Sequence, residues 1–301
     1  MLHFAIPLAA LLAPQRPPIN AQLPRRLERC LPVPSLAEDI KARQAQTPHP
    51  EVRIERIKFV GNITLPASAL EELANSLRTR SFDADSDWMQ EAVDIHAREV
   101  WQRYGYYNVV VNGESRLLND DKDHQRVSVT IHVTEGPQYR LAYIRFEHAD
   151  VFPPQELRKL IPLDDGEVFD VLRIRQGLDA LKKLYGTKGY IDFTASPLTE
   201  VDERGRRIKL TLDLDEDTQY RVGKITVLGL APKTEAALVW RLKPGEVFDY
   251  KFYLDFFEDN KSLLPPDANP QLDSHISRDA RAATVDIIVD FRGCPVENGR
   301  P

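Results

Sequence analysis

Tyr139-Arg-Leu-Ala-Tyr-Ile-Arg-Phe146 opens the stretch of sequence that decides the fold, and this stretch continues to Glu216. The apolar strand is followed by a proline break at Pro153-Pro154, after which the apolar spacing predicts two helices. The second helix carries an apolar stripe and ends at Gly186 and Gly189. The period then changes from 3.6 to 2, because apolar residues alternate with polar ones at Ile208, Leu210, Leu212 and Leu214. The stretch therefore predicts the order strand, helix, helix, strand, strand.

The same order of signals occurs once before this stretch and once after it. The first copy opens at Val52-Arg-Ile-Glu-Arg-Ile-Lys-Phe-Val-Gly61, and the third opens at Tyr220-Arg-Val-Gly-Lys-Ile-Thr-Val-Leu-Gly229. The turn Gly166-Glu-Val-Phe-Asp170 of the middle copy recurs letter for letter as Gly245-Glu-Val-Phe-Asp249. Equivalent points lie about 80 residues apart, which is longer than the period of stacked repeats. Each copy is therefore predicted to be a small domain with its own core.

Two short steps within the copies have a physical explanation. A Phe-Asp step precedes the second helix at Phe82-Asp83, Phe169-Asp170 and Phe248-Asp249. Aspartate accepts hydrogen bonds from the first amides of a helix, and the phenylalanine can fold back onto the first turn. A Gly-Tyr step ends the helix at Gly105-Tyr106 and Gly189-Tyr190, because glycine tolerates a positive φ. Both steps are structural signals and predict no chemistry.

Composition describes a folded chain and argues against one class of partner. Hydrophobic residues make up 42% of the 301 residues, charged residues make up 29%, and the formal net charge is −6 without a basic cluster. Binding to a phosphate backbone needs a positive face, so we expect no nucleic-acid partner.

The N-terminal segment has the composition of an export signal. Residues 1–13 are apolar but too short to cross a bilayer as a helix, and residues 19–21 fit a cleavage site. We predict a signal peptide at 1–21 and a proline-rich linker at 22–51. The segment before the apolar run contains no Lys or Arg, so a frayed apolar N-terminus is the alternative.

The repeated features resemble the POTRA domain, the polypeptide-transport-associated module of outer-membrane barrel assembly and translocation proteins. The features that carry the resemblance are the opening strands, the Phe-Asp and Gly-Tyr steps, and the closing alternating strands. The resemblance implies an α+β fold of three tandem β-α-α-β-β domains, each a three-stranded mixed sheet covered by two helices. We place these domains at 52–137, 138–217 and 218–292, followed by a tail at 293–301.

The sequence departs from the family pattern in two ways. The third copy has no Gly-Tyr step, because its second helix leads into Leu264-Pro-Pro266, and its middle strand near 274–279 is short and polar. We therefore treat the third domain as divergent. No series of alternating strands that would form a membrane barrel follows the third copy, so we expect a protein without the barrel.

The middle strand of each domain is the predicted binding element. Pro197 in the second copy and Asn112-Gly113 in the first are typical of sheet edges or bulges. An exposed edge can accept another chain by main-chain hydrogen bonds, as the resemblance also implies. The alternative is that charge and proline protect the edge from pairing. The predicted partner-binding residues are Tyr107, Asn108, Val109, Val110, Val111, Ile191, Asp192, Phe193, Thr194 and Ala195.

Catalytic and metal signals are weak. The seven histidines show no ligand spacing, and we expect no cofactor and no metal site. Asp213 and Asp215 share one strand face, which is more typical of a solvated face than of an acid/base pair. Cys30 and Cys294 could form a disulfide in an oxidising compartment, but a tandem of domains would hold them far apart; an intermolecular bridge or free thiols are the alternatives.

These observations lead to one functional prediction and two rivals. We predict a non-enzymatic, exported periplasmic protein, associated with the outer membrane, that assists outer-membrane protein assembly or translocation by strand addition. Its predicted partners are unfolded outer-membrane proteins or a separate outer-membrane β-barrel assembly protein, with no small-molecule substrate. The rivals are an envelope spacer that binds no client and a hydrolase that uses Asp213 and Asp215.

Overall fold

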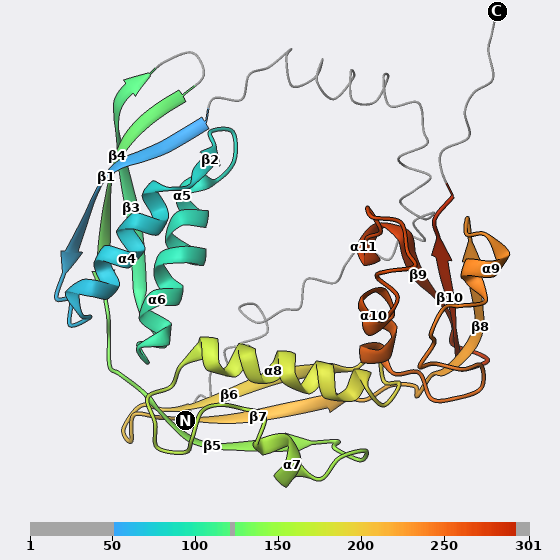
Figure 1. The fold of residues 1–301 in the computed structure, drawn as a ribbon. Helices are drawn as coiled ribbons and strands as arrows, with labels where there is room; N and C mark the ends of the chain where they lie inside the picture. Colours follow the sequence, from blue (N-terminus) through green and yellow to red (C-terminus); the bar gives the residue numbers. More distant parts are fainter. Residues whose placement is uncertain (1–50, 121–123, 293–301) are drawn as a thin grey trace, which may run out of the picture.

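The computed structural model describes residues 51–120 and 124–292, which form three sheets with helices packed on them. The predicted signal peptide, most of the linker, the tail, Cys30 and Cys294 lie outside the described residues. Figure 1 shows three domains that follow one another along an arc, with α4, α6, α8 and α10 on its inner side. Within the described residues, no helix is long and apolar enough to cross a membrane.

Domain 1 contains four strands, one more than the sequence predicts. Its elements are β1 (Glu51–Gly61), α4 (Ala67–Arg78), β2 (Ser81–Asp83), α5 (Trp88–Gln90), the π-helix η1 (Glu91–Ala97), α6 (Arg98–Arg103), β3 (Val110–Asp120) and β4 (His124–Thr134). The sheet order is β2-β1-β4-β3, with β1 parallel and β3 antiparallel to β4. The extra strand arises because residues 81–83 pair with the start of β1.

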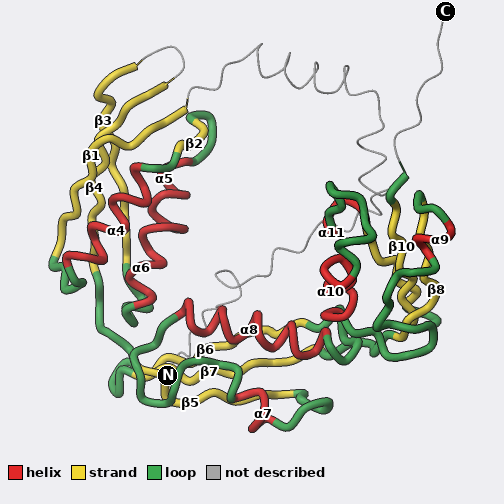
Figure 2. The backbone as a smooth tube through the Cα atoms, in the orientation of Figure 1, coloured by secondary structure: helices red, strands yellow, loops and turns green. Residues whose placement is uncertain are grey.

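Domains 2 and 3 have the predicted three-stranded mixed sheets. Domain 2 contains β5 (Arg140–Glu147), α7 (Pro154–Arg158), α8 (Val171–Gly186), β6 (Thr194–Asp202) and β7 (Arg207–Asp215), in the sheet order β5-β7-β6. Domain 3 contains β8 (Arg221–Leu228), α9 (Pro232–Glu235), α10 (Tyr250–Asp259), α11 (Pro270–Asp273), β9 (Ser274–Asp279) and β10 (Thr284–Asp290), in the order β8-β10-β9. The α+β class and the tandem of three domains are confirmed (Figure 2).

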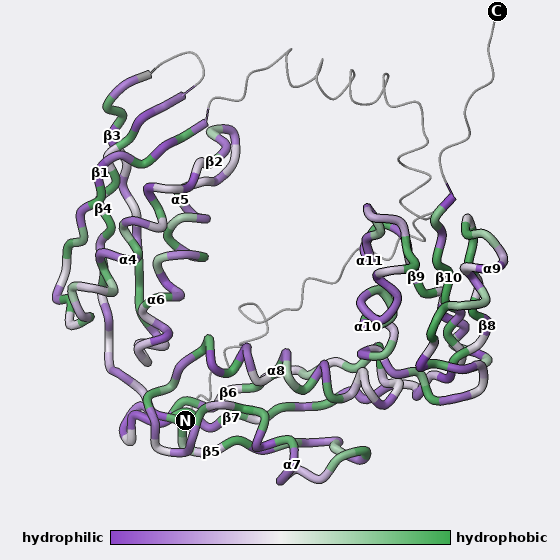
Figure 3. Tube along the Cα trace, in the orientation of Figure 1, coloured by the Kyte–Doolittle hydropathy of each residue, from purple (hydrophilic) through white to green (hydrophobic). Residues whose placement is uncertain are grey.

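Each domain has its own apolar core between the sheet and the helices. The alternation predicted for the last strand of domain 2 is confirmed, because Ile208, Leu210, Leu212 and Leu214 are all buried. Figure 3 shows hydrophobic and hydrophilic residues interspersed along the strands and helices of the three domains. Burial of these side chains is the main favourable contribution to each domain's stability.

The Phe-Asp step caps the second helix in two of the three domains. The Asp170 carboxylate accepts hydrogen bonds from the amides of Leu172 (2.8 Å) and Arg173 (3.2 Å), which begin α8. Asp249 does the same for the first amides of α10. The prediction is wrong for Asp83, which lies in β2 and accepts from the Asp85 amide, while Asp87 caps α5. The pairing of β2 with β1 keeps Asp83 away from the helix start.

We expect Asp170→Ala to destabilise domain 2 by about 1 kcal/mol, because two amides at the start of α8 lose their acceptor. Amide hydrogen exchange of α8 measures this loss. Asp83→Ala is the matched control, since Asp83 caps no helix. If Asp83→Ala reduced the exchange protection of α8 as much as Asp170→Ala does, the assignment of Asp170 as the cap of α8 would be wrong.

Candidate functional site

The predicted binding strands are at the sheet edges, but six of the ten predicted residues lie outside the strands. β3, β6 and β9 each pair with one neighbour only, which confirms their edge positions. β3 begins at Val110 and β6 at Thr194, three residues later than predicted. Residues 107–109 and 191–193 instead form turns, in which the amides of Val109 and Phe193 donate to carbonyls three residues earlier. These turns follow from the positive φ of the preceding glycines, which ends each helix abruptly.

Asn112-Gly113 and Pro197 lie in edge strands, as predicted, and neither forms a bulge. The β3–β4 register is regular at Gly113, and the irregularity comes later, between Leu117 and Asn119. A Cβ atom on Gly113 would lie 2.3 Å from the Met89 sulfur and 2.7 Å from a Val93 methyl, so glycine allows η1 and α5 to approach β3 closely. Pro197 lies within β6 opposite Leu212 without a bulge.

Tyr107, predicted to bind a partner, lies at the joint between domains 1 and 2. Its side chain is 6% exposed and belongs to the core of domain 2. The ring meets Phe169 edge-on with 5.8 Å between centroids, and its hydroxyl lies 3.0 Å from the Thr199 hydroxyl. Burial raises the pKa of the Tyr107 phenol. Ile191 occupies the corresponding place in domain 2 and packs against the core of domain 3. Both residues therefore hold domains together.

Main-chain hydrogen bonds and polar side chains complete the first joint. The Tyr139 amide donates to the Gly105 carbonyl (2.8 Å), and the Gln138 side chain donates to the Tyr104 carbonyl (2.8 Å). The Asn108 side-chain amide donates to the Tyr139 hydroxyl at 3.2 Å, and this hydroxyl donates to the Glu203 carboxylate within domain 2 at 2.6 Å. Burial and then the hydrogen bond to Glu203 raise the pKa of Tyr139 to about 12. The joint is thus a set of directed contacts rather than a flexible linker.

The second joint repeats the first. The Tyr220 amide donates to the Gly189 carbonyl (2.9 Å), and the Gln219 side chain donates to the Lys188 carbonyl (3.0 Å). A Cβ on Gly189 would lie 2.6 Å from the Tyr220 carbonyl oxygen, so a larger residue does not fit. Asp192, another predicted binding residue, forms an ion pair with Arg278 of β9 at 2.7 Å.

Sequence reasoning missed these joints although the signal was present. Gln138-Tyr139-Arg140 recurs as Gln219-Tyr220-Arg221, each at the start of a domain's first strand. The Gly-Tyr step, predicted to end the helix, has a second role. The carbonyl of its glycine accepts the hydrogen bond from the first tyrosine amide of the next domain. In both domains the same residues therefore end a helix and position a neighbour.

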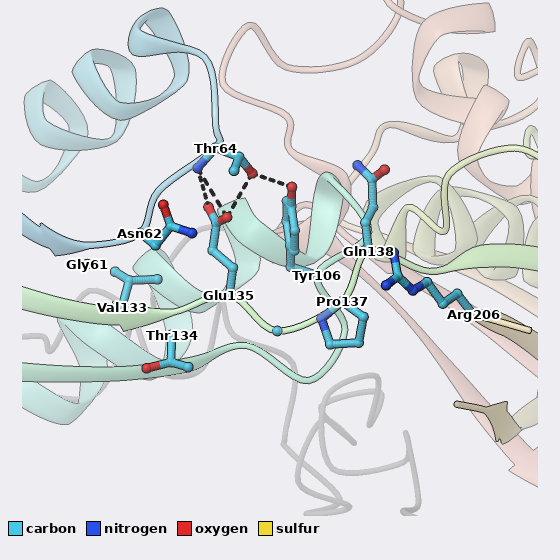
Figure 4. Close-up of a pocket in the computed structure, with 11 residues that line it drawn as sticks. Gly61, Asn62, Thr64, Tyr106, Val133, Thr134, Glu135, Pro137, Gln138 and Arg206 are labelled. Atoms are coloured by element: carbon cyan, nitrogen blue, oxygen red, sulfur yellow. Dashed lines mark hydrogen bonds between the residues drawn. The ribbon is translucent and has the colours of Figure 1, made fainter. Parts of the chain in front are cut away.

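A buried carboxylate lies beside the first joint, in an open hollow of about 790 Å³ (Figure 4). Glu135 accepts hydrogen bonds from the Thr64 amide (3.0 Å) and the Trp101 indole (2.9 Å), and the Thr64 hydroxyl also donates to it (2.7 Å). The Thr64 hydroxyl is in turn hydrogen-bonded to the Tyr106 hydroxyl. These donors fix the loop after β1 to the end of β4, so the carboxylate has a structural role.

Glu216 is the corresponding carboxylate of domain 2, and it fixes the loop after β5 to the end of β7. Glu216 accepts from the Tyr185 hydroxyl (2.6 Å) and from the Val151 amide (3.1 Å). Burial and the bond to Glu216 raise the pKa of Tyr185. In domain 3, Phe291 directly follows β10 and meets Phe257 with 6.2 Å between ring centroids.

The two aspartates considered for catalysis have local partners. The Asp213 carboxylate lies 2.6 Å from the His148 ring, and this contact raises the pKa of that histidine. Asp215 accepts a hydrogen bond from the Asp217 amide at 3.2 Å. Among the described residues, no three His, Cys, Asp or Glu side chains gather into a site that could hold a metal ion.

Comparison with known proteins identifies the repeat. A family model described as POTRA, surface antigen variable number repeat, matches residues 52–136 and 139–217, which is more than half of the chain. A protein of Treponema pallidum (strain Nichols) assigned as an outer membrane protein assembly factor is 25% identical over 230 residues, covering 72% of this chain and 27% of that protein. Outer membrane protein assembly factor BamA of Buchnera aphidicola is 24% identical, covering 67% of this chain and 34% of that protein.

A solved structure shares the fold of the described domains. The crystal structure of Haemophilus influenzae BamA POTRA3-5 matches with a TM-score of 0.61 and 19% identity, covering 80% of this chain and 96% of that one. The chain spans only 27% and 34% of the length of the two curated relatives. Two matched repeats and a third domain with the same strand and helix order support one assignment. The chain belongs to the POTRA family.

Proposed function

We propose that the protein is a non-enzymatic periplasmic component that assists outer-membrane protein assembly or translocation. It binds extended segments of client or partner chains by adding them as strands to its sheet edges. The clients are unfolded outer-membrane proteins, and a separate outer-membrane β-barrel assembly protein is the second class of partner. The relatives named as outer membrane protein assembly factors support this role.

One observation carries the mechanism. In each sheet the strand that follows the second helix pairs on one side only, so β3, β6 and β9 leave a row of main-chain groups without a ladder neighbour. An extended chain can satisfy these groups irrespective of its sequence, which suits a protein that must accept many different strands. Barrel strands alternate apolar and polar residues over about ten positions, and the sheets here also have one apolar and one polar face.

Titration of the full chain with a barrel-strand peptide tests this proposal. We expect amide chemical shifts to change along at least one of the edges β3, β6 and β9 when a peptide of about ten residues is added. A scrambled peptide that lacks alternation is the control. Edge signals that do not move at millimolar peptide would rule out strand addition.

Unchanged edge signals would favour a second candidate function, an envelope spacer that binds no client chain. The two joints give specific support to this second candidate, because the same hydrogen bonds fix both pairs of neighbouring domains. A spacer would keep its partners at a fixed separation without recognising extended chains. It would bind folded partners only, through surfaces other than the strand edges.

A further inference from the structure

We infer that an incoming strand adds to the β3 edge of domain 1, and that the edges of β6 and β9 reject it. This inference rests on the proposed function and names the edge that performs it. It also assigns Pro197 as a residue that determines the choice.

The three edge strands share one register with their neighbours. Gly113, Pro197 and Ser274 lie opposite Ile131, Leu212 and Val289, which are equivalent buried positions of the three central strands. In an antiparallel pair, the N–H and C=O of one residue both face the partner strand or both face away. Proline has no N–H, and β6 keeps its register through Pro197, so the main chain of Pro197 faces away from β7.

The outward-facing residues of β6 are therefore Ala195, Pro197, Thr199 and Val201. An added strand would find no donor at Pro197, near the centre of this row. It would also meet domain 1, because the Thr199 side chain is only 4% exposed on an edge strand and is covered by Tyr107. Glu203, just past the end of β6, is held by Tyr139. The β6 edge is thus interrupted in the middle and occupied at one end.

The β9 edge is closed for a different reason. β9 has 6 residues, and its outward positions by the shared register are Ser274, Ile276 and Arg278. Arg278 forms the ion pair with Asp192 of the second joint at 2.7 Å. An incoming strand would have to break this contact and would gain a row of only a few main-chain hydrogen bonds.

The β3 edge has none of these obstacles. It has 11 residues and no proline, and its outward positions are Val111, Gly113, Ser115 and Leu117. Leu117 is 52% exposed and Leu118 is 39% exposed, so this end of the edge presents apolar side chains that a neighbouring strand would cover. Glu114 and Arg116 lie on the opposite face and are exposed. The occupant is therefore an extended segment with apolar residues on the helix side and polar residues on the other.

Proline scanning of the full chain tests the choice of edge. The probe is a barrel-strand peptide of about ten residues that carries a photo-crosslinker at its centre, and the attached segments are found by mass spectrometry. We expect crosslinks to β3 in the wild type. Ser115→Pro removes one outward donor without breaking a bond to β4, so binding should weaken by roughly tenfold. Ser115→Ala keeps the donor and should bind as the wild type does.

Pro197→Ala is the reciprocal variant, because it restores the missing donor of β6. We expect it to add crosslinks on β6 while those on β3 remain. Wild-type crosslinks on β6 or β9, or equal binding by Ser115→Pro and Ser115→Ala, would overturn the inference and leave strand addition intact. Absence of crosslinks to every edge would overturn the proposed function itself.

Discussion

Trp101→Ala is expected to unfold domain 1 while domains 2 and 3 keep their folds. The Trp101 side chain is fully buried, packs against Phe59 at 6.0 Å between ring centroids, and belongs to a core built from domain 1 residues. Its loss creates a large cavity, for which the typical cost is about 3–5 kcal/mol. The Glu135 carboxylate also loses its indole donor. A small domain with one core has about that much stability to lose.

Amide hydrogen exchange read separately for each domain measures this effect. Protection should collapse in β1 and β4 and persist in β5 and β7. Trp101→Phe separates the two contributions, because it keeps most of the ring but leaves Glu135 without one donor, at a cost of about 1–3 kcal/mol. Uniform loss of protection in all three domains would contradict the separation into independent cores.

The sequence predicts the fold well where the signal is local. Alternation in β7, the proline start of α7 and the capping Asp170 all follow from periodicity and backbone chemistry, and all are confirmed. The additional strand β2 could not be predicted, because three residues carry no period and their pairing with β1 is decided by tertiary contact. The π-helical η1 was missed for a similar reason, since its apolar residues also fit an ordinary helix.

The site was harder to predict than the fold. Topology places β3 and β6 at edges as the sequence predicts, but Tyr107 and Ile191, which the sequence analysis places in these strands, lie in the turns before them and pack against the next domain. Each of these side chains is covered by residues of the next domain. An analysis of one repeat at a time cannot predict contacts between repeats. Comparison of the two Gln-Tyr-Arg segments at Gln138 and Gln219 would have pointed to the joints, because identical residues at a domain boundary indicate a shared contact.

Tyr107→Ala is expected to uncouple domains 1 and 2 while both remain folded. The substitution removes the aromatic contact with Phe169, the hydrogen bond to Thr199 and much of the apolar area at this joint. We expect a loss of about 3 kcal/mol from the contact between the domains, at the low end for a buried aromatic because the joint lies near solvent. The main-chain bond from Tyr139 to Gly105 is left with little packing around it.

Residual dipolar couplings of the full chain measure the uncoupling. In the wild type, β4 and β7 should share one alignment tensor, as the two domains move together. In Tyr107→Ala the two tensors should differ, whereas Tyr107→Phe should stay close to the wild type because it loses only the hydroxyl contact with Thr199. Ile191→Ala should free domain 3 and leave the first joint unchanged. If Tyr107→Ala keeps a single tensor, the remaining contacts alone, including the Arg175–Glu99 ion pair at 3.1 Å, suffice to fix the domains, and the aromatic insertion is not what sets their angle.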